Sequence, residues 1–190
     1  MSQKAILPGF IVDVSSNQDH PINWNEVKKA GCIGAILKAS QGTSTVVNPF
    51  FHEDLAACNK NKIPVMAYHF AEFGNVQDEV TAFSQVAGAH ARVLDIETSS
   101  DLVWTNHFFD LLKNKYKFDN NQLLLYGSAS SVPRRGAKAR LWVADYGKNP
   151  GFGVCWQYTE NGQINGIANH VDLSRWTGGK PLFDTFFEVK

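Results

Sequence analysis

The sequence predicts an α/β fold: an incomplete TIM-like barrel of about five β/α units, followed by about three strands with little helix. Short apolar runs alternate with helical patterns as far as residue 126, which implies parallel strands joined by right-handed crossovers. Beyond that point, apolar runs recur with turn-rich segments at 147–153 and 161–166 between them. Acidic or aromatic residues stand at the ends of successive runs.

The regular part of the pattern divides into five strands and the helices between them. Strands are expected at 10–12, 32–37, 63–69, 93–96 and 122–126, and helices at 23–31, 49–59, 76–87 and 102–116. Trp24 and Val27 recur on one face of the first helix, which Gly31 ends. Asn48 is expected to cap the second helix, with Pro49 at its first position.

The last part of the chain is expected to hold strands without crossover helices. Strands are predicted at 141–144, 154–158 and 170–173, and the segments between them are short and rich in turn residues. With no internal repeat or low-complexity linker, residues 1–190 are interpreted as one domain with a core of about 8–177 and a tail at 178–190.

Composition excludes several classes of protein. The 190 residues are 44% hydrophobic and 12% aromatic, as in globular proteins. The net charge of zero argues against a nucleic-acid partner. Basic residues do gather at 113–117 and 134–140, which we interpret as a solvated helix face and a solvated loop.

The cysteines and the hydropathy pattern indicate the cellular compartment in which the protein is expected to be made. Cys32, Cys58 and Cys155 show no paired spacing, and core thiols in a reducing compartment are expected. The N-terminus has no signal-peptide pattern and no run is long enough for membrane insertion, so the protein is expected to be made in the cytoplasm. The histidines show no metal-ligand spacing, so neither a metal nor another cofactor is predicted.

The pair Asp95 and Glu97 closes the apolar run 93–96. On a strand these two carboxyls emerge on the same side, about 7 Å apart at Cα. Like charges this close resist double ionisation, and a proton-holding carboxyl beside an ionised one is typical of glycosidases. Most Asp-x-Glu triplets are surface features or salt-bridge partners. The apolar run before the pair and the polar segment 98–101 after it favour the catalytic interpretation.

The other candidate site residues lie at the ends of predicted strands. Active sites of parallel β/α folds lie at the carboxyl ends of the strands. The residues at such ends are Asp13, Lys38, Tyr68, His69, Phe70, Asp95, Glu97, Tyr126, Asp145, Tyr146, Gln157, Tyr158 and Asp172.

Six segments carry a resemblance to a known family. They are DVSSNQ at 13–18, LKASQG at 37–42, AYHF at 67–70, LDIE at 94–97, LWVADY at 141–146, and WQYT at 156–159 continuing through GI at 166–167 to VDL at 171–173. In this order the chain resembles glycoside hydrolase family 25, the Chalaropsis-type lysozymes or muramidases. The resemblance covers the catalytic domain, and we expect no separate cell-wall-binding module.

The resemblance implies a function and roles for four acids. The family cleaves the β-1,4 bond from N-acetylmuramic acid to N-acetylglucosamine in bacterial peptidoglycan. By this resemblance Glu97 is the general acid/base and Asp95 assists it, with retention through the substrate's acetamido group. Burial at a strand end is expected to raise the pKa of Glu97. Asp13 and Asp172 match the remaining acids, as chemical participants or as structural ligands of backbone N–H groups.

Aromatic and polar side chains are expected to build the sugar cleft, because sugar CH faces pack on flat rings. For each aromatic candidate, core packing is the alternative to ligand contact. Lys38 is expected either to pair with Asp13 or Asp95 or to reach the substrate. The predicted substrate-binding set is Lys38, Tyr68, His69, Phe70, Tyr126, Trp142, Tyr146, Gln157 and Tyr158.

Three interpretations remain open from the sequence. The first is a monomeric phage or prophage endolysin that acts on the cell wall after holin-dependent release; a bacterial enzyme or a delivered effector has the same sequence features. The second is a glycan-binding barrel that has lost turnover. The third is a hydrolase of chitinase or glucosaminidase type.

Overall fold

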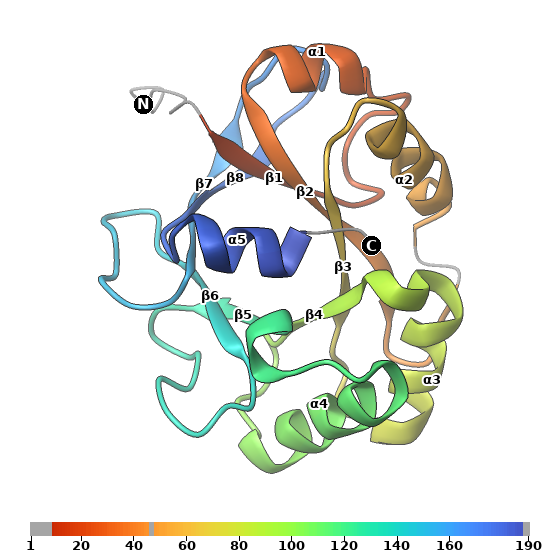
Figure 1. Cartoon of the computed structure of the whole chain (residues 1–190), viewed down its shortest axis with the longest axis vertical. Helices are drawn as coiled ribbons and strands as arrows, with labels where there is room; N and C mark the ends of the chain where they lie inside the picture. Colours follow the sequence, from red (N-terminus) through yellow and green to blue (C-terminus); the bar gives the residue numbers. More distant parts are fainter. Residues whose placement is uncertain (1–8, 46–47, 188–190) are drawn as a thin grey trace.

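The chain folds into a closed barrel of eight strands in sequence order (Figure 1). The computed structural model describes residues 9–45 and 48–187. The strands are β1 (Phe10–Val14), β2 (Cys32–Gln41), β3 (Val65–Phe70), β4 (Ala91–Asp95), β5 (Leu124–Ser128), β6 (Arg140–Ala144), β7 (Cys155–Gly162) and β8 (Val171–Trp176).

Helices cover only part of this ring. The helices α1 (Trp24–Lys29), α2 (Phe51–Lys60), α3 (Val76–Ala87) and α4 (Leu102–Tyr116) follow β1 to β4, and Figure 1 shows them outside the ring from its top round to its bottom. Short 3-10 turns, η1 (Gly88–His90) and η2 (Asn120–Gln122), precede β4 and β5. The predicted class is confirmed: the helical layer is incomplete although the strand ring is closed. The helix-bearing units are four, because the segment 129–139 between β5 and β6 holds no helix.

The last strand runs in the opposite direction to the other seven. Neighbouring strands are parallel from β1 to β7, whereas β8 runs antiparallel to both β7 and β1. A short connection from β7 leaves no length for a crossover, so the chain turns back. The beginning of β8 therefore lies on the rim where the parallel strands end. Asp172, expected at the end of a strand, reaches that rim from near the start of β8, opposite Asp13 in the pairing register.

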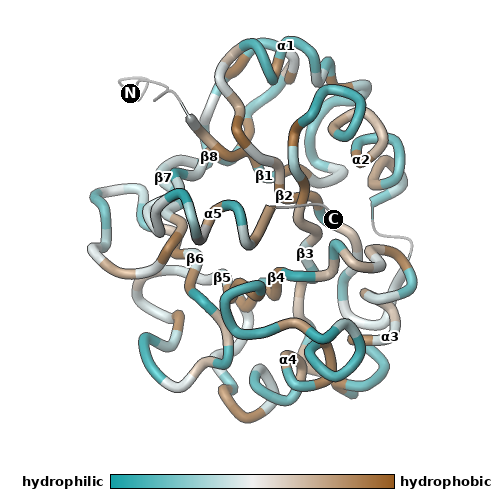
Figure 2. The backbone as a smooth tube through the Cα atoms, viewed as in Figure 1, coloured by the Kyte–Doolittle hydropathy of each residue, from teal (hydrophilic) through white to brown (hydrophobic). Residues whose placement is uncertain are grey.

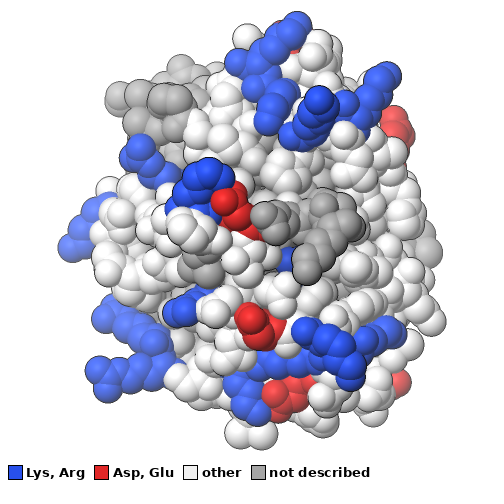
Figure 3. Space-filling view, in the orientation of Figure 1, with Lys and Arg blue, Asp and Glu red and all other residues white. Residues whose placement is uncertain are grey.

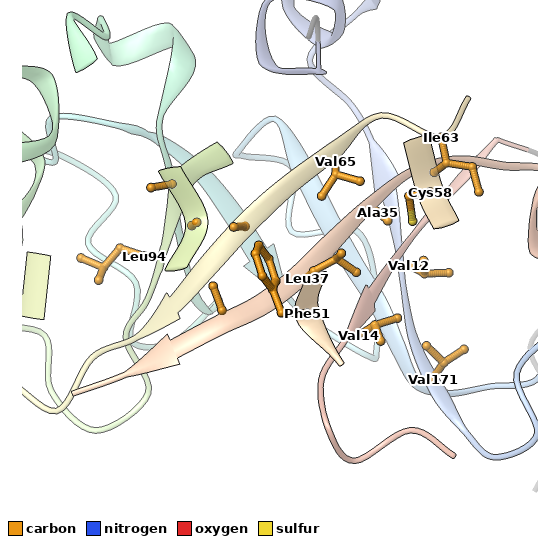
Figure 4. Close-up of a cluster of buried hydrophobic side chains, with 14 of the residues drawn as sticks. Val12, Val14, Ala35, Leu37, Phe51, Cys58, Ile63, Val65, Leu94 and Val171 are labelled. Carbon is orange, nitrogen blue, oxygen red and sulfur yellow. The ribbon is translucent and has the colours of Figure 1, made fainter. Parts of the chain in front are cut away.

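Alternating strand residues divide the core into two layers. Ile11 and Ile36 belong to the cluster inside the barrel, and Val12 and Leu37 belong to the larger cluster between the strands and the helices. Figure 4 shows Val12, Leu37 and Leu94 of this outer cluster with Phe51, from α2, among them. Figure 2 shows the hydrophobic segments along the strands and hydrophilic ones on the outer helices and loops.

A fifth helix closes the end of the barrel where the strands begin. This helix, α5 (Lys180–Phe187), lies across the ring in Figure 1 and places Phe186 and Phe187 in the inner cluster. Its fit is close: a Cβ added at Gly34 would lie 2.8 Å from the Phe187 ring. The predicted core limit at residue 177 is therefore wrong, because part of the tail at 178–190 is a barrel plug. Residues 188–190 lie outside the described part.

The charged surface and the cysteines match what the sequence led us to expect. Figure 3 shows Lys and Arg side chains spread round the edge of the face that carries α5. In the basic segments, Lys138 pairs with Asp110 at 2.5 Å. Cys32, Cys58 and Cys155 are free thiols buried in the core. Within the described ranges, no helix is long and apolar enough to span a membrane.

Candidate active site

A cavity of about 210 Å³ opens at the carboxyl ends of the parallel strands, opposite α5. It brings together most of the predicted site. Its lining consists of Asp13, Ser15, Asn17, Gln18, Lys38, Tyr68, Phe70, Asp95, Glu97, Tyr126, Trp142, Gln157 and Asp172.

Asp95 and Glu97 form the first carboxyl pair of this cavity. Asp95 is the last residue of β4 and only 6% exposed, whereas Glu97 is exposed. Burial, and then the negative charge of Glu97, raise the pKa of Asp95 well above its usual value, against the opposing charge of Lys38. The expectation that Glu97 is the buried member is therefore corrected: Glu97 is exposed, and Asp95 is the buried carboxyl of the pair. Within the described residues, Asp95 Oδ1 is buried without a hydrogen-bond partner.

Asp13 and Asp172 form the second pair, across the antiparallel contact of β1 with β8. Burial and the Asp172 charge raise the pKa of Asp13 well above its usual value. Burial raises the pKa of Asp172 to about 6, although a hydrogen bond from Asp13 opposes the change. Asp13 therefore keeps the proton that the pair shares, and it donates a hydrogen bond to Asp172. Gln157 Nε2 donates to Asp13 Oδ2 at 2.8 Å, so Asp13 is bonded by both Gln157 and Asp172 inside the protein.

Gln157 links this second pair to two tyrosines. Its Oε1 accepts from the hydroxyls of Tyr126 at 2.8 Å and Tyr146 at 3.0 Å. Tyr126 also packs on Trp142, with ring centroids 4.4 Å apart, and Trp142 Nε1 donates to Ser174 Oγ. One side of the cavity is thereby fixed by buried hydrogen bonds.

Lys38 does not make the expected contact ion pair. Its Nζ donates to Gln41 Oε1 at 2.9 Å and lies 4.9 Å from the centre of the Phe70 ring. Among the described residues, no carboxylate lies within 4.0 Å of it. Partial burial lowers its pKa, and the charges of Asp95 and Glu97 oppose that change. Lys38 is thus a cation on the cavity wall that the acids attract through space.

Two predicted substrate-binding residues point away from the cavity. The His69 ring is fully buried between β3 and the outer helices, bonded to Ser40 Oγ at 2.8 Å and Glu79 Oε2 at 2.9 Å. Tyr158 is buried in the outer hydrophobic cluster. Their immediate neighbours Tyr68 and Gln157 line the cavity, and a shift of one residue along a strand reverses the face. Assignment of His69 and Tyr158 to the sugar cleft is therefore wrong.

The structure adds residues that strand ends did not reveal. Ser15, Asn17 and Gln18 line the cavity from the loop after β1, where Gln18 Oε1 accepts from the Ser15 backbone N–H at 2.8 Å. They lie in the segment 13–18 that carried the family resemblance, which was the available signal. Among the described residues, no group of three or more His, Cys, Asp or Glu side chains has a geometry that holds a metal ion.

A second cavity of about 290 Å³ adjoins the first. The two share Glu97 and Tyr126, so Glu97 stands between them. The second cavity is also lined by Ser128, Ser131, Ala144, Asp145 and Tyr146. The predicted Tyr146 therefore lies in this second cavity and not in the first.

Comparison with known families identifies this arrangement. The model for glycosyl hydrolases family 25 matches residues 12–167. The chain belongs to this family. It is a glycoside hydrolase of the lysozyme type.

Two curated relatives and two solved structures agree with the family. Lysozyme M1 of Streptomyces globisporus is 30% identical over 88% of this chain and 67% of its own length. The autolytic lysozyme of Clostridium acetobutylicum is 24% identical over 88% of this chain, which spans only 56% of that protein. A lysozyme from Streptomyces coelicolor matches with a TM-score of 0.81 at 25% identity, over 95% of this chain and 98% of that one. A family 25 glycosyl hydrolase from Bacillus anthracis has the same fold, with a TM-score of 0.80 at 20% identity over 95% and 94% of the two chains.

Proposed function

We propose that this protein hydrolyses the β-1,4 bond between N-acetylmuramic acid and N-acetylglucosamine in peptidoglycan, with Glu97 as the general acid. One observation carries the assignment: Asp95 Oδ1 is buried, without a hydrogen-bond partner among the described residues, in a cavity that Glu97 also lines. A buried carboxyl oxygen with no hydrogen-bond partner is costly unless a ligand supplies one. The acetamido N–H of the muramic sugar is a donor of the required kind.

Substrate binding is expected to change the charge on Asp95. In the free enzyme, burial and then the Glu97 charge raise the pKa of Asp95 and so favour its protonated form. A hydrogen bond from the acetamido N–H to Oδ1 favours the ionised form of Asp95. Glu97 lines the same cavity and is placed to supply the proton to the bridging oxygen. Substrate binding thus charges Asp95 beside the acid.

The bond-breaking steps then follow from the two roles. Glu97 donates its proton to the bridging oxygen as the bond from that oxygen to the anomeric carbon breaks. The acetamido carbonyl oxygen attacks the same carbon, and Asp95 stabilises the positive charge that develops on the acetamido group. A water molecule, deprotonated by Glu97, opens the cyclic intermediate. Two displacements at one carbon retain its configuration.

A wall-digestion experiment tests this function. The wild-type protein should clear a suspension of purified sacculi, and reductive labelling should find muramic acid at the new reducing ends. Glu97→Gln should lower the rate by about 10³-fold or more, because the amide cannot donate the acidic proton. Its circular dichroism spectrum should be unchanged, since Glu97 is exposed.

The same experiment decides among the alternatives. Glucosamine at the new reducing ends would indicate a glucosaminidase or chitinase-like enzyme. A 1,6-anhydro end would indicate a lytic transglycosylase. Binding to sacculi without any new ends would leave a glycan-binding barrel. A Glu97→Gln protein with full turnover would refute the assignment of the acid.

We also propose that the protein acts on the wall as an endolysin released from the cytoplasm. Its three cysteines are free and buried, so its fold needs no oxidising compartment. Cytoplasmic expression in a susceptible host should leave cells intact until a holin is co-expressed, and lysis should then follow. Lysis of the same strain without a holin would contradict this route.

A further inference from the structure

Two hydrogen bonds in series connect Lys38 to an acid outside the first cavity. Lys38 Nζ donates to Gln41 Oε1 at 2.9 Å, and Gln41 Nε2 donates to Glu72 Oε1 at 2.9 Å. Lys38 and Gln41 both belong to β2, whereas Glu72 follows β3 by two residues and is exposed. The ammonium on the cavity wall is therefore held from the surface of the protein.

The groups at the two ends of this series fix the orientation of the Gln41 amide. An ammonium group can only donate hydrogen bonds, and a carboxylate can only accept them. The amide oxygen must therefore face Lys38 while the amide nitrogen faces Glu72, which is the observed arrangement. Without Glu72 the amide is free to turn, because water can either donate or accept.

A buried carboxylate anchors the loop that carries Glu72. Glu79, fully buried in α3, accepts from the backbone N–H groups of Glu72 at 3.2 Å and Gly74 at 2.6 Å. The His69 ring connects Glu79 Oε2, at 2.9 Å, to Ser40 Oγ, at 2.8 Å. Burial lowers the pKa of His69, so its neutral ring donates to Glu79 and accepts from Ser40. The loop is thereby fixed to both β2 and β3.

A glycine makes room for the Glu72 carboxylate. Gly42 follows Gln41 with φ +51°, and its backbone N–H donates to the Phe70 carbonyl at 3.1 Å. A Cβ added at Gly42 would overlap the Glu72 carboxylate. The absence of a side chain at this position lets the carboxylate lie against the backbone at the end of β2, within reach of the Gln41 amide.

The position of the Lys38 ammonium determines how strongly it acts on the acid pair. The acids whose charges act on Lys38 are Asp95, Glu97 and Glu72, and Asp172 also acts on Asp95. Contact with a cation favours the ionised form of a carboxyl much more than the same cation does at a distance. A general acid must keep its proton until the bond breaks, so contact with Lys38 would oppose proton transfer.

From this arrangement we propose that Glu72 is a positioning residue: acting through Gln41, it holds the Lys38 ammonium away from the Asp95–Glu97 pair, so that the pair keeps the proton used in catalysis. The assignment rests on the proposed function. Glu72 acts on the reaction only through Lys38. When Glu72 is lost, Lys38 turns to the acids that attract it, and the pair loses its last proton at a lower pH.

The variant Glu72→Ala tests this role, and its exposed position makes the substitution compatible with the fold. The alkaline limb of the pH profile of sacculus digestion should move to lower pH by about half a unit, the size expected for one contact ion pair near a surface. The carboxyl carbon of Asp95, followed by ¹³C NMR in the free protein, should titrate at lower pH as well. The signal is assigned by its loss in Asp95→Asn.

A second background separates the position of Lys38 from the charge of Glu72. Removing a negative charge would by itself favour ionisation of nearby acids, whether or not Lys38 moves. In Lys38→Met, which has no ammonium to release, adding Glu72→Ala should produce no further change in either titration. Gly42→Ala displaces the Glu72 carboxylate but keeps its charge, and it should move both titrations in the direction of Glu72→Ala. Asp78→Ala, at an exposed acid in the first turn of α3, is the matched control and should move neither.

The contrary results are equally distinct. A shift for Glu72→Ala that persists in the Lys38→Met background, or that Asp78→Ala reproduces, would show a direct effect of charge and overturn the proposal. An unchanged Asp95 titration in Glu72→Ala would overturn it too. A wild-type protein that does not digest sacculi would overturn the proposed function, and the Asp95 titrations would still decide whether Glu72 controls the position of Lys38.

Discussion

The two carboxyl pairs of the first cavity differ in how they are built and in what they leave free. Asp95 and Glu97 come from one strand and the residues that follow it, with one member buried and the other exposed. Asp13 and Asp172 come from strands at opposite ends of the chain, and barrel closure brings them together. In the part of the chain that the structure describes, the first pair leaves a buried oxygen without a partner, whereas Asp13 is bonded by both Asp172 and Gln157.

This difference indicates separate tasks. A buried acceptor without a donor is a place for substrate, and an exposed acid beside it can reach the bridging oxygen. A carboxyl pair whose proton is already shared and hydrogen bonded is a structural and electrostatic support. Asp13 and Asp172 are accordingly expected to hold the rim of the barrel and to set the charge near Asp95, and not to transfer the proton.

The largest effect that separates the pairs is expected for Asp95→Asn. Loss of this carboxylate removes the charge that stabilises the acetamido group as it becomes positive, which corresponds to a loss of about 10²–10³-fold in kcat. The rate of sacculus digestion measures it. The same isosteric change at Asp13 is the matched control and should cost only about tenfold. Equal losses for the two variants would remove the distinction between the pairs.

A smaller effect, on stability, is expected for Asp13→Asn. Its raised pKa in the fold means that the stability contribution is complete below the unfolded value of 3.8 and is lost as pH rises through the folded value. For its partner Asp172, the pKa in the fold is about 6. Asparagine can still accept from Gln157 and donate to Asp172, but it has no proton to lose.

Asp13→Asn should therefore be more stable than the wild type at neutral pH, by roughly 1–3 kcal/mol, and this gain should shrink toward pH 4. Urea unfolding at several pH values between about 4 and 7 measures the difference. An equal pH dependence in the two proteins would show that Asp13 and Asp172 do not share a proton in the fold.

The sequence predicted the first pair better than the second for a physical reason. The period of two along a strand is local, so the positions of Asp95 and Glu97 in the sequence suffice to place them on one face. The same rule, applied strictly, would have removed His69 and Tyr158, because they alternate with the cavity residues Tyr68 and Gln157.

Other features depend on contacts between distant parts of the chain. The antiparallel direction of β8 follows from barrel closure, and no pattern within residues 171–176 reveals it. The apolar face of α5 becomes a plug only because the barrel end near Gly34 is open to receive Phe187. The second cavity joins Ser128 and Ser131, from a segment with the sequence of an ordinary loop, to Tyr146 from another segment.

The smallest effect tests which of the two tyrosines holds Gln157 in place against Asp13. Tyr126→Phe removes one of the two hydroxyls that donate to Gln157 Oε1, and Tyr126 is 9% exposed. The loss should be about 0.5–1.5 kcal/mol in the free energy of unfolding, because a buried bond disappears while Tyr146 still satisfies the oxygen. Tyr146→Phe removes the other donor, but that side chain is 41% exposed and water replaces the bond at little cost. Urea unfolding should therefore rank Tyr126→Phe below Tyr146→Phe, and the reverse order would mean that the exposed tyrosine, not the buried one, holds Gln157 against Asp13.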